Sequence, residues 1–389
     1  MEIKTPIYMD NHATTPLDPR VLEEMMPYFK EKFGNAASID HIFGSIAYDA
    51  VQKARERIAN SINAKPEEII FTSGATESDN FAIFGIAEKY ADKGNHIITC
   101  VTEHKAILDS CKKLESTGKK ITYLPVDKYG KIDLKLLKDS ITDKTILISI
   151  MSANNEIGTI AEIEKIGKIA KDNNIFFHTD AAQAVGHIPM DVQKMNIDLM
   201  SISAHKIYGP KGIGAIYIRK VNPMVRPAPI IYGGGHERSF RSGTLNVPAI
   251  VGFGKAVQIA NKEMHVENER LKKWTNQIFD SLQKEIDGIE LNGHPTDRLA
   301  HNLNIYIKGI ESKALLHALR EEVAISAGSA CTTADVKPSY VIKALGYDDQ
   351  RAHSSIRFGL GRFNSEKEVN HVLDIIVISI KKINQLNFN

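Results

Sequence analysis

Short apolar runs alternate with amphipathic stretches between residues 45 and 220. Ala50, Ala54 and Ile58 recur at helical spacing, which predicts a helix over residues 47–62. Strand-like runs are expected at 69–71, 96–101, 121–126, 145–151, 175–180, 199–203 and 214–219. Helical segments are expected near 104–117, 133–140 and 161–173. Because parallel strands need crossover connections, this alternation predicts an α/β fold with a mostly parallel, seven-stranded sheet flanked by helices.

The pattern changes after residue 220. The last two strand-like runs are too close together for a crossover helix, so one strand of the sheet is expected to be antiparallel. A long helical region near 248–286 follows, and then a mixed α+β tail. We therefore expect a large α/β domain at 15–260 and a smaller α+β domain formed by 261–389 together with the N-terminal segment 1–14.

Charge and cysteine content argue against several classes of partner. The 49 Lys and Arg residues nearly balance the 47 Asp and Glu residues, so a net charge of +2 gives no general attraction for nucleic acid or an anionic membrane. No apolar run approaches the roughly 18 residues of a membrane span. Three cysteines without a CxxC pair indicate neither a disulfide framework nor a zinc site. We expect a cytoplasmic protein with no nucleic-acid or membrane binding and no resident metal.

Polar and ionisable residues follow most of the predicted strands. The segments are 72–76, 102–104, 152–156, 178–183 and 203–206. In open α/β sheets, ligands bind beyond the carboxyl ends of the strands, so these segments are expected to meet at one edge of the sheet. This convergence is the main functional signal in the sequence.

Three of these segments carry residues that suit a phosphorylated, aromatic cofactor. Ser73 to Thr76 lies between a strand and a helix, where free N–H groups suit a phosphate, but Ser73 or Thr76 could instead simply cap the helix. Lys206 follows an apolar strand and could form a Schiff base in a polar cleft, or be a solvated loop lysine. Asp180 could hold a protonated pyridine nitrogen, cap the next helix or bind a metal.

Further residues are open to both functional and structural interpretations. His104 could stack on an aromatic cofactor and move protons, or be a polar surface residue. Cys331 lies in a run of small residues that would expose its thiol, whereas Cys100 and Cys111 lie in a strand and a helix and are expected to be structural. Arg357 could bind a substrate carboxylate or pair with a structural acid.

Taken together, these motifs resemble the NifS/IscS-type cysteine desulfurases, which are fold-type I enzymes dependent on pyridoxal 5′-phosphate (PLP). The matching segments run through nearly the whole chain in the family's order. They are Asp10-Asn11-His12-Ala13-Thr14-Thr15-Pro16, residues 71–80, Thr102-Glu103-His104-Lys105, Asn154-Asn155-Glu156-Ile157-Gly158, Ser203-Ala204-His205-Lys206, Arg241-Ser242-Gly243-Thr244 and Gly328-Ser329-Ala330-Cys331-Thr332. The resemblance implies a fold-type I PLP-dependent transferase whose smaller domain carries the catalytic Cys331.

The resemblance implies which residues would hold the cofactor ring. Lys206 would bond covalently to the cofactor aldehyde and later move a proton. Asp180 would pair with the pyridine nitrogen, and Gln183 would hydrogen-bond the phenolic oxygen. His104 would stack on the ring and assist proton transfer.

It also implies how the phosphate and the substrate would be bound. The phosphate would be held by the main chain of Ala75 and by Thr76, Ser203, His205 and Thr244. Thr244 would come from a second subunit, which makes the expected active unit a homodimer. Asn155 and Arg357 would orient the carboxylate of L-cysteine.

The implied reaction removes sulfur from L-cysteine. The Cys331 thiolate would attack the substrate sulfur, which leaves a persulfide on Cys331 and releases L-alanine. The sulfur would pass to an IscU/NifU-like scaffold or another acceptor protein, for iron–sulfur cluster assembly or thiolation, and Cys331 could transiently bind an iron–sulfur cluster. The alternatives are a selenocysteine lyase, another fold-type I PLP enzyme such as an aminotransferase, or a pyridoxal-binding scaffold without turnover.

Overall fold

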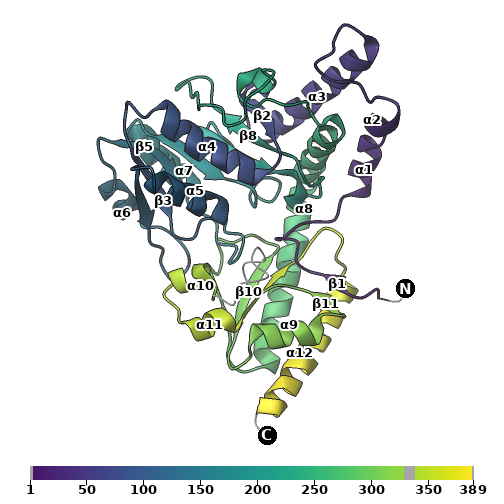
Figure 1. Ribbon diagram of the computed structural model, residues 1–389. Helices are drawn as coiled ribbons and strands as arrows, with labels where there is room; N and C mark the ends of the chain where they lie inside the picture. The colour runs from purple at the N-terminus through teal and green to yellow at the C-terminus, as the bar shows by residue number, and fades with distance from the viewer. Residues whose placement is uncertain (1–2, 328–337, 388–389) are drawn as a thin grey trace.

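A seven-stranded sheet forms the larger part of the computed structural model, which describes residues 3–327 and 338–387 (Figure 1). The strands are β2 (Ile69–Thr72), β3 (His96–Cys100), β4 (Lys120–Leu124), β5 (Thr145–Ser149), β6 (Phe176–Asp180), β7 (Leu199–Ser203) and β8 (Gly214–Ile218). Their order is β2-β8-β7-β6-β5-β3-β4, and β8 alone among them runs antiparallel to both neighbours. The predicted sheet and its one antiparallel strand are therefore confirmed.

Helices cover both faces of this sheet, because its strands are apolar on both sides. The helices of this part of the chain are α1 (Pro19–Met25), α2 (Pro27–Lys30), α3 (Ile42–Ser61), α4 (Ala75–Lys89), α5 (Lys105–Glu115), α6 (Leu134–Asp139), α7 (Ile163–Asp172) and α8 (Val247–Glu285), with short 3₁₀ turns η1 (Pro66–Glu68), η2 (Ala204–Lys206) and η3 (Glu237–Ser239). Of these, α1 and α2 lie against α8. Side chains of α3, α7 and α8 share one core with Ile98, while those of α4 and α5 share another with Ile97. Neighbouring strand residues thus point to opposite faces.

The rest of the chain forms a smaller α+β layer. Its strands are β1 (Ile7–Tyr8), β9 (Ile289–Leu291), β10 (Asn302–Ile307), β11 (Val323–Ala324) and β12 (Ser355–Gly359). Its helices are α9 (Ser312–Leu319), α10 (Tyr340–Ala344), α11 (Asp349–His353) and α12 (Glu366–Asn387). The order β12-β10-β9 makes an antiparallel sheet, and β1 pairs in parallel with β11. That pairing ties the N-terminal segment to the C-terminal part of the chain.

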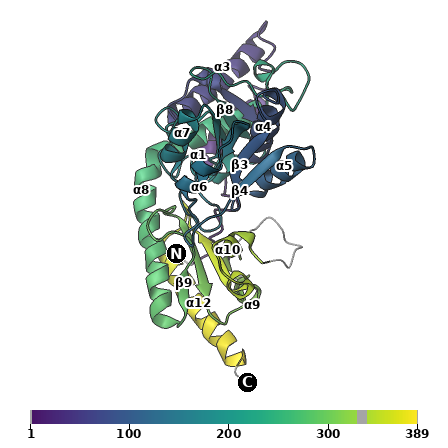
Figure 2. The same ribbon diagram turned by 90° about the vertical axis from the view of Figure 1, so that its left-hand side faces the viewer.

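The long helix α8 belongs to both parts. Figure 2 shows it running along one side of the molecule from the large sheet to the small one. Its first half contributes Phe253 and Val257 to the core of the large sheet, and its second half contributes Leu271 and Ile278 to the core of the small one. We propose the domain division 15–260 and 261–389 with 1–14, with α8 crossing it. Within the described ranges, no helix combines the length and the apolar character needed to cross a membrane.

Candidate active site

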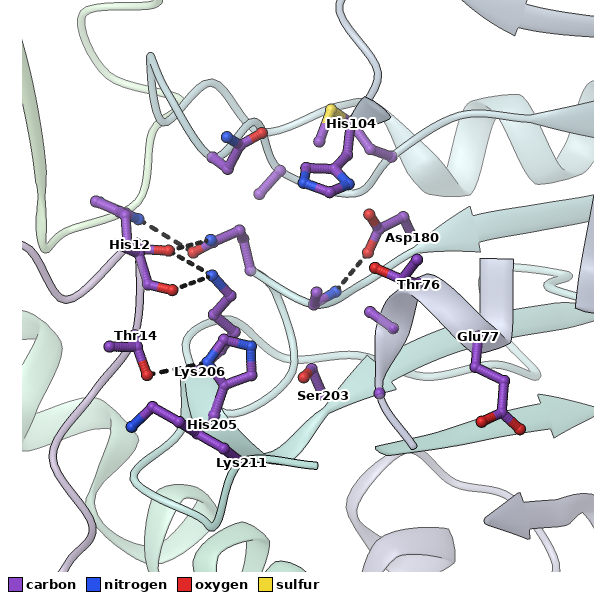
Figure 3. A pocket seen from close by; sticks show the side chains of 18 of the residues that line it. His12, Thr14, Thr76, Glu77, His104, Asp180, Ser203, His205, Lys206 and Lys211 are labelled. Carbon is purple, nitrogen blue, oxygen red and sulfur yellow. Dashed lines mark hydrogen bonds between the residues drawn. The ribbon is translucent and has the colours of Figure 1, made fainter. Parts of the chain in front are cut away.

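A cavity of about 560 Å³ opens at the carboxyl edge of the large sheet (Figure 3). The segments after β2, β3, β5, β6 and β7 all reach it, because the carboxyl ends of parallel strands share one edge. The predicted site residues that line it are Ala75, Thr76, His104, Asn155, Asp180, Gln183, Ser203, His205, Lys206 and Arg357. Thr244 is exposed and does not line this cavity. Cys331 lies outside the described residues.

One end of the cavity is the N-terminus of α4. Its N-cap is Gly74, with a φ of 153° and no side-chain hydrogen bond, so the ordinary cap by Ser73 or Thr76 that the sequence allowed is not formed. A Cβ at Gly74 would meet no atom within 4 Å, which leaves open space beyond the first-turn N–H groups. Thr76, Ser203 and His205 border the same space (Figure 3). Free N–H groups at the positive end of a helix dipole suit a phosphate.

Lys206 stands at the end of η2, directly after β7. Its Nζ donates to the carbonyl oxygens of His12, at 2.6 Å, and Ala13, at 2.8 Å. Figure 3 shows the side chain reaching toward the segment that carries His12. The structure therefore places this amine in the cavity and not in a solvated loop. Burial, and to a smaller extent the charge of Lys206, lowers the pKa of the neighbouring His205 to about 4. The His205 ring is therefore neutral at pH 7.

Asp180 ends β6 with its carboxylate on the cavity, where its Oδ1 accepts the N–H of Ala182 at 2.9 Å. Burial raises the pKa of Asp180, while the charge of His104 and the Ala182 N–H oppose that rise. A second buried acid is Asp79 on α4, and burial together with the charge of Asp180 raises its pKa well above the usual range. Its Oδ1 lies 3.7 Å from Nε2 of His178, whose pKa burial lowers to about 3. Asp79 and His178 are therefore neutral, and of the two carboxyl groups only that of Asp180 lines the cavity.

Arg357 reaches the cavity from β12 of the smaller sheet. Its Nη2 donates to Oδ1 of Asp10 and its Nη1 to the main-chain oxygen of Asn155, both at 2.7 Å. Within the described structure, Nε of Arg357 and Oδ1 of Asn155 are buried without a hydrogen-bond partner. Arg357 therefore does pair with a structural acid, one of its two predicted interpretations, and it also lines the space in which a substrate carboxylate would lie.

Comparison with known proteins identifies the family. The class-V aminotransferase family model matches residues 7–372. The chain is also 53% identical over 386 residues to a cysteine desulfurase IscS of Ehrlichia chaffeensis, a match that covers 99% of this chain and 94% of that protein. The chain belongs to the IscS-type cysteine desulfurases of the class-V aminotransferase family.

Solved structures agree with this family. A NifS-like protein superposes with a TM-score of 0.90 and 37% identity, covering 96% of this chain and 99% of that one. A structure described as SspA in complex with cysteine has a TM-score of 0.82 and 38% identity, covering 92% of this chain and 100% of that one. The predicted resemblance and the fold-type I architecture are therefore confirmed.

Class-V family members use PLP, and the cavity residues of this desulfurase homologue fit that cofactor. The uncapped helix N-terminus suits a phosphate, the Lys206 amine suits an aldehyde, and the Asp180 carboxylate suits a protonated pyridine nitrogen. Among the described residues, no group of three or more His, Cys, Asp or Glu side chains is arranged to hold a metal ion.

The segment His12 to Thr14 has no individual role predicted from the sequence, although its motif is part of the resemblance. In this family member the segment lines the cavity. Two of its carbonyl groups accept hydrogen bonds from Nζ of Lys206, and Oγ1 of Thr14 lies 3.1 Å from Nδ1 of His205. His205 and Lys206 lie more than 190 positions away from it in the chain, so no local pattern connects them.

Glu156 is a second residue without a predicted role, and it supports a pH-dependence prediction. It is buried, Ser339 donates its hydroxyl to Oε1, and Oε2 has no partner among the described residues. Burial raises the pKa of Glu156 to about 7 from 4.5, although the Ser339 hydrogen bond and the charge of Arg357 oppose the shift. The native protein therefore binds more protons here than the unfolded chain between these two pH values, so its stability falls as pH rises through that window.

A Glu156→Gln variant is uncharged in both the native and the unfolded state, so we expect it to lack this fall in stability with rising pH. The free energy of unfolding of the variant minus that of wild type should increase by about 2–3 kcal/mol from pH 5 to pH 8, since one pKa unit corresponds to about 1.4 kcal/mol. Denaturant unfolding at both pH values measures the difference. Glu88→Gln, at an exposed position on α4, is the control. A Glu156→Gln difference that is the same at both pH values would contradict the prediction.

Proposed function

We propose that this chain is a PLP-dependent cysteine desulfurase that converts L-cysteine to L-alanine and leaves the sulfur as a persulfide on Cys331. The observation that carries the proposal is the meeting of Lys206, Asp180 and an uncapped helix N-terminus in one cavity. The curated relatives named cysteine desulfurase IscS support the choice of reaction, because identity to them extends over nearly the full chain.

When bound, PLP supplies an electron sink that stabilises negative charge developing at Cα of an amino acid. Lys206 provides the amine that bonds the cofactor, and after release of that amine it carries the proton at Cα, since its Nζ already lies in the cavity. Asp180 would keep the pyridine nitrogen protonated, because its carboxyl group lines the cavity and a cation placed beside it favours its charged form.

Substrate orientation is assigned to Arg357 and Asn155. Both residues line the cavity, where the Arg357 guanidinium and the Nδ2 group of Asn155 are donors of the kind that a carboxylate accepts. A guanidinium held by Asp10 and a main-chain oxygen is already oriented, so binding a carboxylate costs little further ordering. The Cys331 thiolate would attack the substrate sulfur, so that an S–S bond forms as the Cβ–S bond of the substrate breaks. The electron pair of the broken bond and a proton end on Cβ, which gives L-alanine without an external oxidant.

The partners proposed for this enzyme are a second copy of the chain and a sulfur acceptor. Thr244 is exposed and separate from its own cavity, as expected of a residue that contacts the phosphate of a neighbouring subunit. Apolar side chains also project near α2 and the start of α3, where an interface would cover them; they include Phe29, Phe33, Ile39, Ile42 and Phe43. The acceptor is an IscU/NifU-like scaffold or another protein for iron–sulfur assembly or thiolation, and the location is cytoplasmic.

The test is a sulfur and alanine balance. Purified holoenzyme is given L-cysteine with a thiol reductant, and sulfide and L-alanine are measured; equal amounts of both are expected. Without the reductant, mass analysis of the peptide containing Cys331 should find one added sulfur atom. Amino-group transfer to a keto acid without sulfide would identify an aminotransferase instead, and turnover of selenocysteine alone would identify a selenocysteine lyase.

A further inference from the structure

A chain of largely buried hydrogen bonds leads to the cavity, and it begins at residues that the proposed function does not use. It runs from Arg298 through Asn302, at the start of β10, to His12 and ends at Gln183, which lines the cavity. His12 and Asn302 are each 1% exposed and Gln183 is 5% exposed, so water does not compete for these contacts.

Arg298 sets the orientation of the first amide. A guanidinium can only donate hydrogen bonds, and Nη2 of Arg298 lies 2.7 Å from Oδ1 of Asn302. The Nδ2 group of Asn302 therefore points the other way, where it donates to Nε2 of His12 at 3.0 Å and to the main-chain oxygen of Glu156 at 3.2 Å.

The orientation of Asn302 then determines which nitrogen of His12 carries the proton. Since Nε2 accepts a hydrogen bond, it has no proton, and the single proton of the neutral ring is on Nδ1. Burial, followed by the charge of Arg357, lowers the pKa of His12 well below its ordinary value, so the ring is neutral at pH 7. Nδ1 of His12 lies 3.0 Å from Oε1 of Gln183 and donates to it.

The Gln183 amide is held at both ends by one residue. Its Oε1 accepts from the His12 ring, and its Nε2 donates to the main-chain oxygen of His12 at 3.0 Å. Only one N–H of Nε2 is used in this contact, so the other is left for the cavity that Gln183 lines. Reversing the amide would place two acceptors, Oε1 and the His12 carbonyl, against each other.

Ring stacking keeps the His12 ring in the plane that both hydrogen bonds require. The His12 ring stacks on His301 with centroids 4.4 Å apart and 22° between planes, and His301 stacks on His187 at 4.2 Å and 27°. His187 in turn donates from Nε2 to the main-chain oxygen of Lys206 at 3.0 Å. The stack thus links the N-terminal segment, the start of β10 and the 3₁₀ turn η2, which carries Lys206.

We propose that His12 is a positioning residue that, through the proton on its Nδ1, keeps the Gln183 amide turned with an N–H toward the cavity. The inference rests on the proposed function in one respect: that function puts the phenolic oxygen of PLP next to Gln183. A hydrogen-bond donor there stabilises the anionic form of that oxygen, so losing the donor makes the bound cofactor hold its proton to higher pH.

The test is the pH titration of the visible absorption of bound PLP in substrate-free holoenzyme. His12→Phe keeps a stacking ring but has no donor. Its midpoint is expected to move up by at most about one to two pH units, the size of a hydrogen bond to a charged group, because the main-chain oxygen of residue 12 still accepts from Nε2 of Gln183. His12→Gln restores a donor and is expected to keep the wild-type midpoint. His301→Phe, which alters the stack at a ring whose Nδ1 has no described partner, is the matched control and should also titrate as wild type.

Three results would overturn the proposal: a wild-type midpoint in His12→Phe, an equal shift in His12→Gln, or an equal shift in His301→Phe. Nitrogen NMR of cofactor-free protein labelled at histidine gives a measurement that does not depend on PLP. The signal missing from His12→Gln should have its proton on Nδ1, and a proton on Nε2 would refute the inference. If wild-type protein makes no alanine from L-cysteine but carries the His12 proton on Nδ1, the proposed function is wrong. The inference about His12 is then still supported.

Discussion

Replacing Lys206 with alanine is expected to abolish covalent attachment of PLP and to lower L-cysteine turnover by at least about 10⁴-fold. The loss is large because one amine serves twice, as the group that bonds the cofactor and as the base that moves the Cα proton. Borohydride reduction followed by peptide mass analysis measures the attachment, and alanine formation measures the turnover.

A second lysine on the same cavity makes the Lys206 result decisive. Lys211 also lines the cavity, so a reactive aldehyde has an alternative amine within the site. Wild type should carry the reduced cofactor on residue 206 alone, and Lys220→Ala, after the end of β8, should behave as wild type. Cofactor recovered on Lys211 in the wild type, or full turnover by Lys206→Ala, would show that the assignment of Lys206 is wrong.

Replacing Cys331 with alanine is expected to retain the absorbance of bound PLP and to lower sulfide release by at least about 10⁴-fold, since removing a nucleophile has effects of this order. The other two cysteines cannot replace it. Both are buried and free, and burial, as the largest cause, raises the pKa of Cys100 and of Cys111 to about 12. Neither supplies a thiolate at neutral pH, so Cys331 is the remaining candidate.

The matched controls are Cys100→Ala and Cys111→Ala. Each leaves a small cavity in a core and should lower stability, but sulfide release per folded holoenzyme should stay near the wild-type rate. Sulfide release by Cys331→Ala that equals wild type would contradict the persulfide step while leaving PLP binding intact.

Much of the site could be predicted because it follows directly from strand order. Asp180, Ser203 and Lys206 each come at or just after the end of a buried strand, and a parallel sheet brings such ends to one edge. The choice between their functional and structural interpretations was harder. Gly74, and not Ser73 or Thr76, forms the N-cap of α4, and only backbone geometry reveals that.

Other features depend on contacts that no local pattern encodes. Arg357 alternates with apolar residues on a strand, which is compatible with any buried partner, and its pairing with Asp10 arises only when β12 meets the N-terminal segment. The neutral state of Asp79 likewise depends on burial beside Asp180, on a different element. Burial and proximity set these charges, and both are properties of the folded chain.

By itself, the sequence determined the alternating strands and helices, the presence of one antiparallel strand and the set of strand-end residues, because apolar periodicity and short connections act locally. Tertiary structure alone decided that His12 lies against Gln183, that Lys206 donates to the carbonyl groups of residues 12 and 13, and that three histidine rings stack behind them. These groups come from distant parts of the chain, and their protonation and orientation depend on how closely packing brings them together and excludes water.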